Sequence, residues 1–464
     1  MRYRNIEELR DRLKGIVDFG ASIKTKVSDT QRLREEVIDR LVSNAVFNED
    51  NNIRDVSRWL IYEISHDLGI RPASIHRLYE LMAKGEVSGF TVPAINVRGL
   101  TYDVARAAIR SALKQKIGTL IFEIARSEIG YTQQSPVEYA VVILGAAIKE
   151  NYRAPVFLQG DHFQIRLKNY QQDPVAEINA VKALIREAIE AGFYNIDIDT
   201  STLVDLSKRD VDEQQRLNFE LAAELTACIR TLEPDGISIS VGGEIGEVGG
   251  KNSTVEEFRS FMDGYTRELN KRGGQIKGIS KISVQTGSSH GGVPLPDGSI
   301  AEVKLDFAVH SDISEVAKQE YGLAGTVQHG ASTLPDEAFD KFPQYDTAEI
   351  HLATGFQNIL YDSEFFPGQL RDTIYAYIQD KHADEMKPGQ TREQFIYKTR
   401  KQAFGPFKEA IWNIPEDLRE KISGELERKF DLLFKKLNVH DTLEMVKKYA
   451  VTADVRRPLP SILL

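Results

Sequence analysis

FTVPAINV, residues 90–97, is the stretch at which the character of the sequence changes. Before it, segments such as IEELRDRL (6–13) and RLREEVIDRLV (32–42) place apolar residues three and four positions apart, which is the spacing of an amphipathic helix. After it, short runs rich in β-branched and aromatic residues alternate with helix-like segments. This alternation is typical of a parallel sheet with helical crossovers.

Eight such runs follow one another, with seven helix-like segments between them. Eight repeats predict an α/β fold of the closed (β/α)8 TIM-barrel type rather than an open doubly wound sheet, and no early glycine-rich dinucleotide fingerprint favours the open sheet. We therefore predict a helical N-terminal extension over 1–89, a catalytic barrel over 90–365 and a helical C-terminal extension over 366–464. The predicted strands are 90–97, 119–125, 155–161, 194–200, 237–244, 279–287, 325–330 and 348–355.

The composition is that of a globular enzyme. Apolar residues make up 41% and charged residues 28% of 464 residues, and the formal net charge is -10. This charge argues against a nucleic-acid surface, which normally carries clustered Lys and Arg. The sequence has neither a signal-like apolar region nor an apolar run long enough for a membrane span, so we expect a cytoplasmic protein without a membrane partner. The single cysteine, Cys228, lies in an apolar helical stretch and is expected to be a structural thiol.

Histidines gather at the predicted strand ends. Of nine histidines, His162, His290, His329 and His351 lie at or near the carboxyl ends of predicted strands. These ends meet at the active-site face of a TIM barrel, so the side chains should converge. Three imidazoles suit a catalytic Zn²⁺ that keeps an open coordination position, and we predict that the first three of these histidines bind the metal. Glu244 ends the fifth strand and is a further candidate ligand.

Asp161 precedes His162 directly and is a candidate general acid/base. In a regular strand the two side chains would point in different directions, so a turn is needed to bring both to the site. Two glycine-containing segments follow other histidines, SSHGG (288–292) and HGAS (329–332). Because small residues let backbone N–H groups approach an anion, these segments favour a phosphate site.

Taken together, these motifs resemble the class II fructose-bisphosphate and tagatose-bisphosphate aldolases from about Phe90 to Ile411. FTVPAINV resembles the first-strand motif of that family and nominates Asn96 for substrate contact. DH resembles the family's general-base aspartate followed by a zinc histidine, and GFYNIDIDTS, GEIG, GSSHG and QHGAS resemble its later strand ends. The resemblance implies Asp161 as catalytic residue, His162, Glu244, His290, His329 and Asp199 at the metal, and Gly291, Gly330, Ser332, His351, Thr354 and, in YKTRK, Arg400 at the substrate or its phosphates.

The implied activity is reversible aldol cleavage of a ketose phosphate, with fructose 1,6-bisphosphate, a substrate of glycolysis, expected to give dihydroxyacetone phosphate and glyceraldehyde 3-phosphate. Asp161 would take the proton of the C4 hydroxyl while the metal polarises the carbonyl. The expected cofactor is Zn²⁺ or another divalent metal, with a monovalent cation beside it. The expected partners are a small sugar phosphate and further copies of the chain in a homodimer or higher homo-oligomer.

The sequence also departs from the family. Lys251 and Asn252 stand where acidic residues are usual, with Glu247 the remaining candidate for that proton transfer, and the last strand reads HLAT instead of an NxDT-like motif, so that His351 and Ala353 replace two substrate contacts. These changes leave alternatives open. One is a metal-dependent sugar or sugar-phosphate epimerase that works by retro-aldol cleavage and re-addition. Others are a non-catalytic sugar-phosphate-binding protein and a Schiff-base aldolase that uses Lys281.

Overall fold

The computed structural model describes residues 2–20, 23–246, 251–287, 295 and 305–463. Eight parallel strands close into a barrel, because the first strand pairs with both the second and the last, and the remaining strands pair in sequence order. All eight predicted strands are therefore confirmed. They are β4 (Val92–Asn96), β5 (Ile121–Ala125), β6 (Val156–Gln164), β7 (Asn195–Asp199), β8 (Ser240–Glu244), β9 (Lys281–Val284), β10 (Thr326–Gln328) and β11 (Thr347–Leu352).

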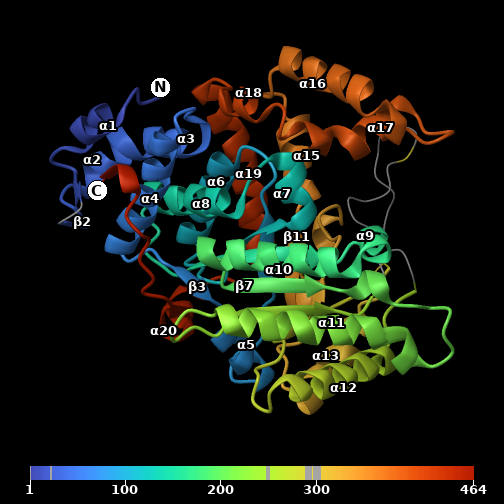
Figure 1. The fold of residues 1–464 in the computed structure, drawn as a ribbon. Coiled ribbons are helices and arrows are strands. Elements are labelled where there is room, and N and C mark those ends of the chain that lie inside the picture. The colour runs from blue at the N-terminus through green and yellow to red at the C-terminus, as the bar shows by residue number, and fades with distance from the viewer. Residues whose placement is uncertain (1, 21–22, 247–250, 288–294, 296–304, 464) are drawn as a thin grey trace.

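Helices surround the barrel, as Figure 1 shows. Local signals set their limits: α10 starts with Asp173 as its N-cap and Pro174 in its first turn, and it ends at Gly192, whose φ of 101° suits glycine. The helices between and directly after the strands are α6 (Thr101–Lys114), α7 (Arg126–Thr132), α8 (Pro136–Lys149), α9 (Leu167–Gln172), α10 (Pro174–Ala191), α11 (Val211–Leu232), α12 (Val255–Arg272), α13 (Ala308–Tyr321), α14 (Lys341–Gln344) and α15 (Thr354–Asp362).

The N-terminal extension is mainly helical, but it also contains strands that the periodicity did not predict. An antiparallel hairpin lies between the first and second helices, and a short strand, β3, continues the sheet beside the start of β6. The elements are α1 (Ile6–Leu13), β1 (Val17–Gly20), β2 (Ile23–Val27), α2 (Thr30–Arg32), a π-helical turn (Leu33–Val37), α3 (Ile38–Phe47), α4 (Asn51–Asp67), β3 (Pro72–Ser74) and α5 (His76–Ala83).

The C-terminal extension returns across the barrel. Its longest helix, α19, packs on α6, and Phe430 of α19 stacks on Phe356 of α15 with the ring centroids 4.6 Å apart. The 3-10 turn at Arg400–Ala403 contacts both α7 and α16. The elements are α16 (Gly368–Lys381), α17 (Arg392–Thr399), a 3-10 turn (Arg400–Ala403), α18 (Lys408–Trp412), α19 (Glu416–Lys436), α20 (Leu443–Tyr449) and β12 (Val451–Thr452).

Residues 451–457, which we call the C-terminal strap, tie the end of the chain to the N-terminal extension. β12 pairs antiparallel with β3. Beyond it, Arg456 Nη1 donates to Glu63 Oε2 at 2.7 Å, and the backbone N–H of Arg457 donates to Glu63 Oε1 at 3.1 Å. Glu63 lies on α4 and is buried. The strap thus satisfies a buried carboxylate of the opposite extension, and Figure 1 shows both chain ends on the same side of the molecule.

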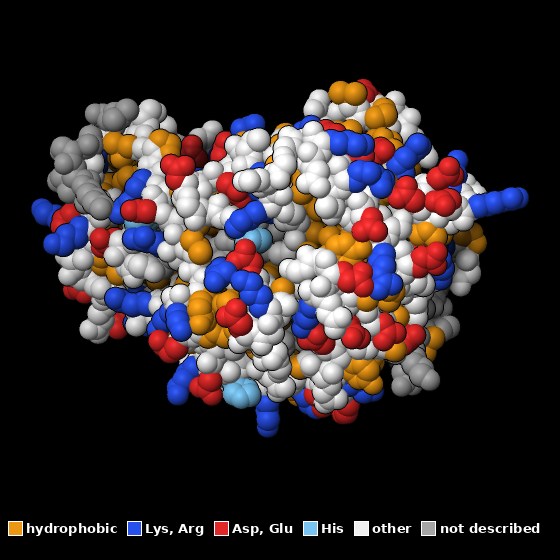
Figure 2. All heavy atoms as spheres, turned by 90° about the horizontal axis from the view of Figure 1, so that it is seen from below, with side chains coloured by type: hydrophobic (Ala, Val, Ile, Leu, Met, Phe, Trp, Pro, Cys, Tyr) orange, Lys and Arg blue, Asp and Glu red, His pale blue; other side chains and the backbone are white. Residues whose placement is uncertain are grey.

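Acidic and basic side chains are interspersed over the face in Figure 2, where neither sign forms a large patch. Within the described residues, no helix combines the length and the apolar character that a membrane span requires.

Candidate active site

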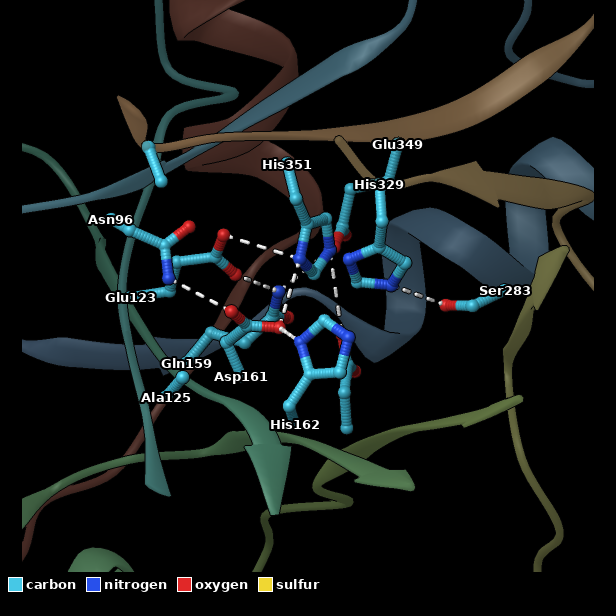
Figure 3. A network of polar contacts seen from close by, with 12 residues as sticks. Asn96, Glu123, Ala125, Gln159, Asp161, His162, Ser283, His329, Glu349 and His351 are labelled. Carbon is cyan, nitrogen blue, oxygen red and sulfur yellow. Dashed lines mark hydrogen bonds and ion pairs between the residues drawn. The ribbon is translucent and has the colours of Figure 1, made fainter. Parts of the chain in front are cut away.

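The carboxyl ends of the barrel strands surround a cavity of about 280 Å³. Five of the predicted site residues that line it come from four different strands, and Figure 3 shows them turned toward one another. The barrel therefore brings together side chains that lie more than 250 positions apart in the sequence. They are Asn96 of β4, Asp161 and His162 of β6, His329 directly after β10 and His351 of β11.

A bulge in β6 directs both Asp161 and His162 into the site. Gly160 pairs with Ile196 and Phe163 pairs with Ile198, so β6 uses one more residue than β7 between these two pairs. His162 takes up the difference with a φ of 41°, in the left-handed region that non-glycine residues seldom adopt. The two neighbouring side chains then contact each other, with His162 Nδ1 and Asp161 Oδ1 2.5 Å apart. The turn that the sequence required at this point is thus present.

Two groups of potential metal ligands share His162, one with Asp199 and Glu244 and one with His329 and Asp161, and we call His162, His329, Glu244 and Asp199 the donor set. The rings of His162 and His329 have their centroids 4.2 Å apart, and His162 Nε2 lies 3.6 Å from Glu244 Oε2. Potential ligand atoms of His162, Asp199 and Glu244 lie within 4.8 Å of one another. Asp161 accepts a hydrogen bond from Nδ1 of His162. The other ring nitrogen, Nε2, is then the atom that would bind the metal, which is the usual arrangement for a metal-binding histidine.

The electrostatics of this donor set also favour a cation. Burial, followed by the negative charge of Asp199, raises the pKa of Glu244 well above its ordinary value. A divalent cation would reverse this effect, because it stabilises the ionised carboxylate. Burial alone would raise the pKa of Asp161 too, but the charges and hydrogen bonds of His162 and His351 hold it well below its ordinary value. These contacts favour the ionised form of Asp161, which is the form that can accept a proton.

Asn96 and His351 hold Asp161 from two further sides. Asn96 Nδ2 donates to Asp161 Oδ2 at 2.8 Å, and His351 Nδ1 lies 3.1 Å from Asp161 Oδ1. The other ring nitrogen of His351, Nε2, lies 2.6 Å from Glu349 Oε1. His351 lines the cavity, but both of its nitrogens face carboxylates of the protein. His351 thus contacts Asp161 and Glu349, while its contact with the substrate stays a prediction.

Beneath His351, the barrel interior contains an ionic network. Lys281 is fully buried, and its Nζ donates to Asp197 Oδ2 at 2.9 Å and to Gln159 Oε1 at 3.0 Å, and also to Glu349. Tyr79 of α5 donates to the same Glu349. The ammonium group of Lys281 is thus committed to protein carboxylates, and Lys281 is absent from the described cavity lining, which argues against its use as a Schiff-base lysine. The sequence signal for this network was a charged residue, Lys281, at the start of an otherwise largely apolar strand.

The remaining predicted residues divide into three groups. Gly330, Ser332 and Thr354 line the cavity, as expected for substrate or phosphate contacts. Arg400 does not reach the cavity in this structure, because its guanidinium faces Asp362 and Asn358 on α15. The adjacent residue, Lys401, lines the cavity in its place. His290, Gly291 and Glu247 lie outside the described residues.

Several cavity residues were not predicted from the sequence. Arg98 follows β4, Arg126 and Glu128 follow β5, and Arg166 follows β6, so all four occupy the strand-end positions that face the site of a barrel. Arg126 is paired with Glu177. Their position relative to the predicted strands was the available signal, and it was overlooked because none of these residues belongs to a recognised motif.

Comparisons with known proteins agree with this fold. The family model described as fructose-bisphosphate aldolase class-II matches residues 76–418. No curated protein matches the chain. Among solved structures, a probable tagatose 6-phosphate kinase from Sinorhizobium meliloti 1021 is similar at 17% identity and a TM-score of 0.55, over 77% of this chain and 99% of that chain. A fructuronate-tagaturonate epimerase from Cohnella laeviribosi is similar at 11% identity and a TM-score of 0.53, over 93% and 98%. A fructose-bisphosphate aldolase from Campylobacter jejuni is similar at 16% identity and a TM-score of 0.47, over 80% and 97%.

Proposed function

The chain belongs to the class II fructose-bisphosphate aldolase family, and from this premise we propose that it catalyses the metal-dependent, reversible aldol cleavage of a ketose phosphate. The observation that carries the proposal is the position of Asp161. Its ionised carboxylate is held at the cavity by Asn96, His162 and His351, directly beside the donor set for the metal. A proton acceptor and a metal that share one cavity are what aldol cleavage requires.

The residues of the chain divide the reaction between them. Zn²⁺ held by His162, His329 and Glu244 would supply Lewis-acid polarisation of the substrate carbonyl. Asp161 accepts the proton of the C4 hydroxyl as the C3–C4 bond breaks, so that C4 becomes an aldehyde. The electron pair of the broken bond passes to C3 of the ketose half, which takes up a proton there before it leaves, and this proton balances the one that Asp161 accepted. Gly330 and Ser332 line the cavity where a phosphate of the substrate can be bound.

The first substrate to test is fructose 1,6-bisphosphate, with release of dihydroxyacetone phosphate as the readout. We expect the zinc-loaded protein to release it and Asp161→Asn to lower kcat by about 10²–10⁴-fold, the usual contribution of a general acid/base. Asp235→Asn is the matched control, because Asp235 is exposed. Full activity of Asp161→Asn, or full activity in excess chelator, would contradict the proposal.

A second candidate function is epimerisation of a sugar or sugar phosphate by the same cleavage followed by re-addition to the opposite face of the aldehyde. The likeness to the Cohnella laeviribosi epimerase favours it, because that likeness extends over 93% of this chain and so includes most of both extensions. NMR analysis of the products separates the two candidates. An epimerase gives a new hexose isomer and no free three-carbon product, whereas an aldolase gives the three-carbon products.

A further inference from the structure

We propose that Tyr79 of α5 is a positioning residue for Asp161, the proton acceptor of the reaction. It acts through two buried side chains of β11, Glu349 and His351, so that a helix of the N-terminal extension takes part in preparing the catalytic site. This inference rests on the proposed function, because Asp161 is the general base there. It goes beyond that function because Tyr79 is absent from the described cavity lining.

Tyr79 reaches the barrel interior from the end opposite the cavity. It is fully buried, and its hydroxyl donates to Oε2 of Glu349, the third residue of β11. The centroid of its ring lies 5.9 Å from Nζ of Lys281, the first residue of β9. Both contacts lie in the first half of parallel strands whose carboxyl ends surround the cavity. The tyrosine therefore enters from the amino ends of the strands.

The hydroxyl of Tyr79 fixes one oxygen of Glu349, while the other oxygen is shared between several donors. Oε1 accepts from Gln159 Nε2 at 2.8 Å and from Lys281, and it lies 2.6 Å from Nε2 of His351. Within the described part of the chain, no residue other than Tyr79 donates to Oε2. A carboxylate with a donor at each oxygen cannot rotate without breaking a hydrogen bond. Tyr79 thus keeps Oε1 turned toward His351.

The ring of His351 has a second carboxylate within reach at each of its nitrogens. Nδ1 lies 3.1 Å from Asp161 Oδ1 and 3.2 Å from Glu123 Oε1. Nε2 lies 2.6 Å from Glu349 Oε1 and 3.5 Å from Asp197 Oδ2. Figure 3 shows the ring between Asp161 and Glu349. A small rotation of the ring would exchange Asp161 for Glu123, and the contact with Glu349 opposes this rotation.

Asp161 in turn depends on His351 for its own orientation. Its Oδ1 contacts both His351 and His162, and its Oδ2 accepts from Asn96. If His351 turned away, Asp161 would keep two of these three contacts, and its carboxylate would be free to turn from the C4 hydroxyl. A misplacement of about 1 Å can lower a rate about 10²-fold. A change at Tyr79 therefore reaches the reaction through the barrel interior.

Tyr79→Phe tests this chain of contacts, because it removes the hydroxyl and keeps the ring. With fructose 1,6-bisphosphate and the zinc-loaded protein, we expect kcat to fall about 5- to 30-fold, the effect of a substitution within a coupled network. KM should stay within about 2-fold, because Tyr79 is not part of the described cavity lining. In the Asp161→Asn background, Tyr79→Phe should lower the residual kcat by less than about 2-fold, because the base that it positions is gone.

Tyr265→Phe is the matched control. Tyr265 of α12 is also buried, and its hydroxyl donates to Thr226 Oγ1 of α11 at 3.0 Å, so this substitution removes a buried hydrogen bond outside the barrel interior. Both variants should fold, with Tm lowered by no more than about 1–3 °C. Only Tyr79→Phe should change kcat.

The nitrogen signals of the histidine rings report the position of His351 without any need for turnover. In zinc-loaded protein with 15N-labelled histidine, the signals of His351 are identified by their loss in His351→Gln. We expect Tyr79→Phe to shift the Nδ1 signal of His351, because this nitrogen loses its hydrogen bond to Asp161. Tyr265→Phe should leave the signal in place.

The inference is overturned if Tyr79→Phe keeps the kcat of the unsubstituted protein, or if it lowers kcat by the same factor with and without Asp161. It is equally overturned if the Nδ1 signal of His351 does not move. Failure of the proposed function looks different, because the unsubstituted protein then releases no dihydroxyacetone phosphate. In that case the His351 signal of Tyr79→Phe still decides whether Tyr79 positions the ring.

Discussion

Replacement of Lys281 by methionine tests the ionic network inside the barrel. The substitution removes the ammonium group that contacts both Asp197 and Glu349, at a position with no solvent exposure, and leaves His351 as the other basic side chain that contacts both carboxylates. Removing one partner of a buried ion pair costs about 3–5 kcal/mol, because the remaining charge is left uncompensated. The entropy of unfolding is about 2.1 cal/mol/K per residue, which is about 1 kcal/mol/K for a chain of 464 residues. We therefore expect Lys281→Met to lower Tm by about 3–5 °C.

The loss should also depend on pH. Burial would raise the pKa of Glu349, but Lys281 and His351 hold it at about 2, below its ordinary value of 4.5. Stability from such a depressed pKa is present above about 4.5 and is lost as the pH falls toward 2. Without Lys281, burial raises the folded pKa, and a carboxyl with a raised folded pKa loses stability as the pH rises. The difference in Tm between variant and unsubstituted protein should therefore widen as the pH rises above about 4.5, the ordinary pKa of the carboxyl.

Differential scanning calorimetry measures both effects. Lys277→Met is the matched control, because Lys277 is 54% exposed and its ion pair with Glu80 should be worth about 0–1 kcal/mol. Adding Glu349→Gln to Lys281→Met should recover part of the lost Tm, since it removes one of the carboxylates that Lys281 no longer compensates. The reasoning is refuted if Lys281→Met has the same Tm as the unsubstituted protein. It is also refuted if Lys281→Met and Glu349→Gln lower Tm additively.

The other predictions concern the metal, the arginine beside Lys401 and the C-terminal strap. His329→Ala should weaken Zn²⁺ binding by at least about 10-fold in competition with a chromophoric chelator, while the exposed His440→Ala should not, and equal affinities would exclude His329 as a ligand. Arg400→Met should destabilise the protein by about 1–3 kcal/mol in urea unfolding, because Arg400 is buried and its guanidinium donates hydrogen bonds to Asn358 and Asp362. Lys401→Met should leave the unfolding midpoint unchanged. The opposite pattern would reverse the roles assigned to these two residues. Deleting residues 451–464 should lower Tm by a few degrees and speed cleavage of α4 by a protease, and an unchanged Tm would show that the strap does not contribute to stability.

The barrel was predictable because its signals are local. Each strand is a short run of apolar and β-branched residues, such as TLIFEIA (119–125), set between amphipathic segments. The hairpin β1–β2 was missed because its strands are short and partly polar, so the helical spacing on either side of it dominated the pattern. β3 was missed because three residues carry too little periodicity to be recognised, and its pairing with β6 and β12 identifies it.

The site was predictable where a residue type and a strand end coincide, as they do for His162 and His329. The site was not predictable where the sequence leaves open which of two neighbouring side chains faces the cavity. Arg400 and Lys401 are adjacent and both cationic, and only the packing of the turn after α17 against α7 and α16 decides which of them faces the cavity. The bulge at His162 is of the same kind, because the sequence required a turn there without specifying its form.

The C-terminal strap also constrains how the protein is made. Glu63 receives its hydrogen bonds from Arg456 and Arg457, which lie 393 and 394 positions later in the chain. At about 5–20 residues per second, a ribosome needs about 20–80 s to add that many residues. During this interval the first helices have left the ribosome, while the carboxylate that they must bury has no partner. The nascent N-terminal extension is thus a segment on which chaperones can act, and its final docking is one of the last events of folding.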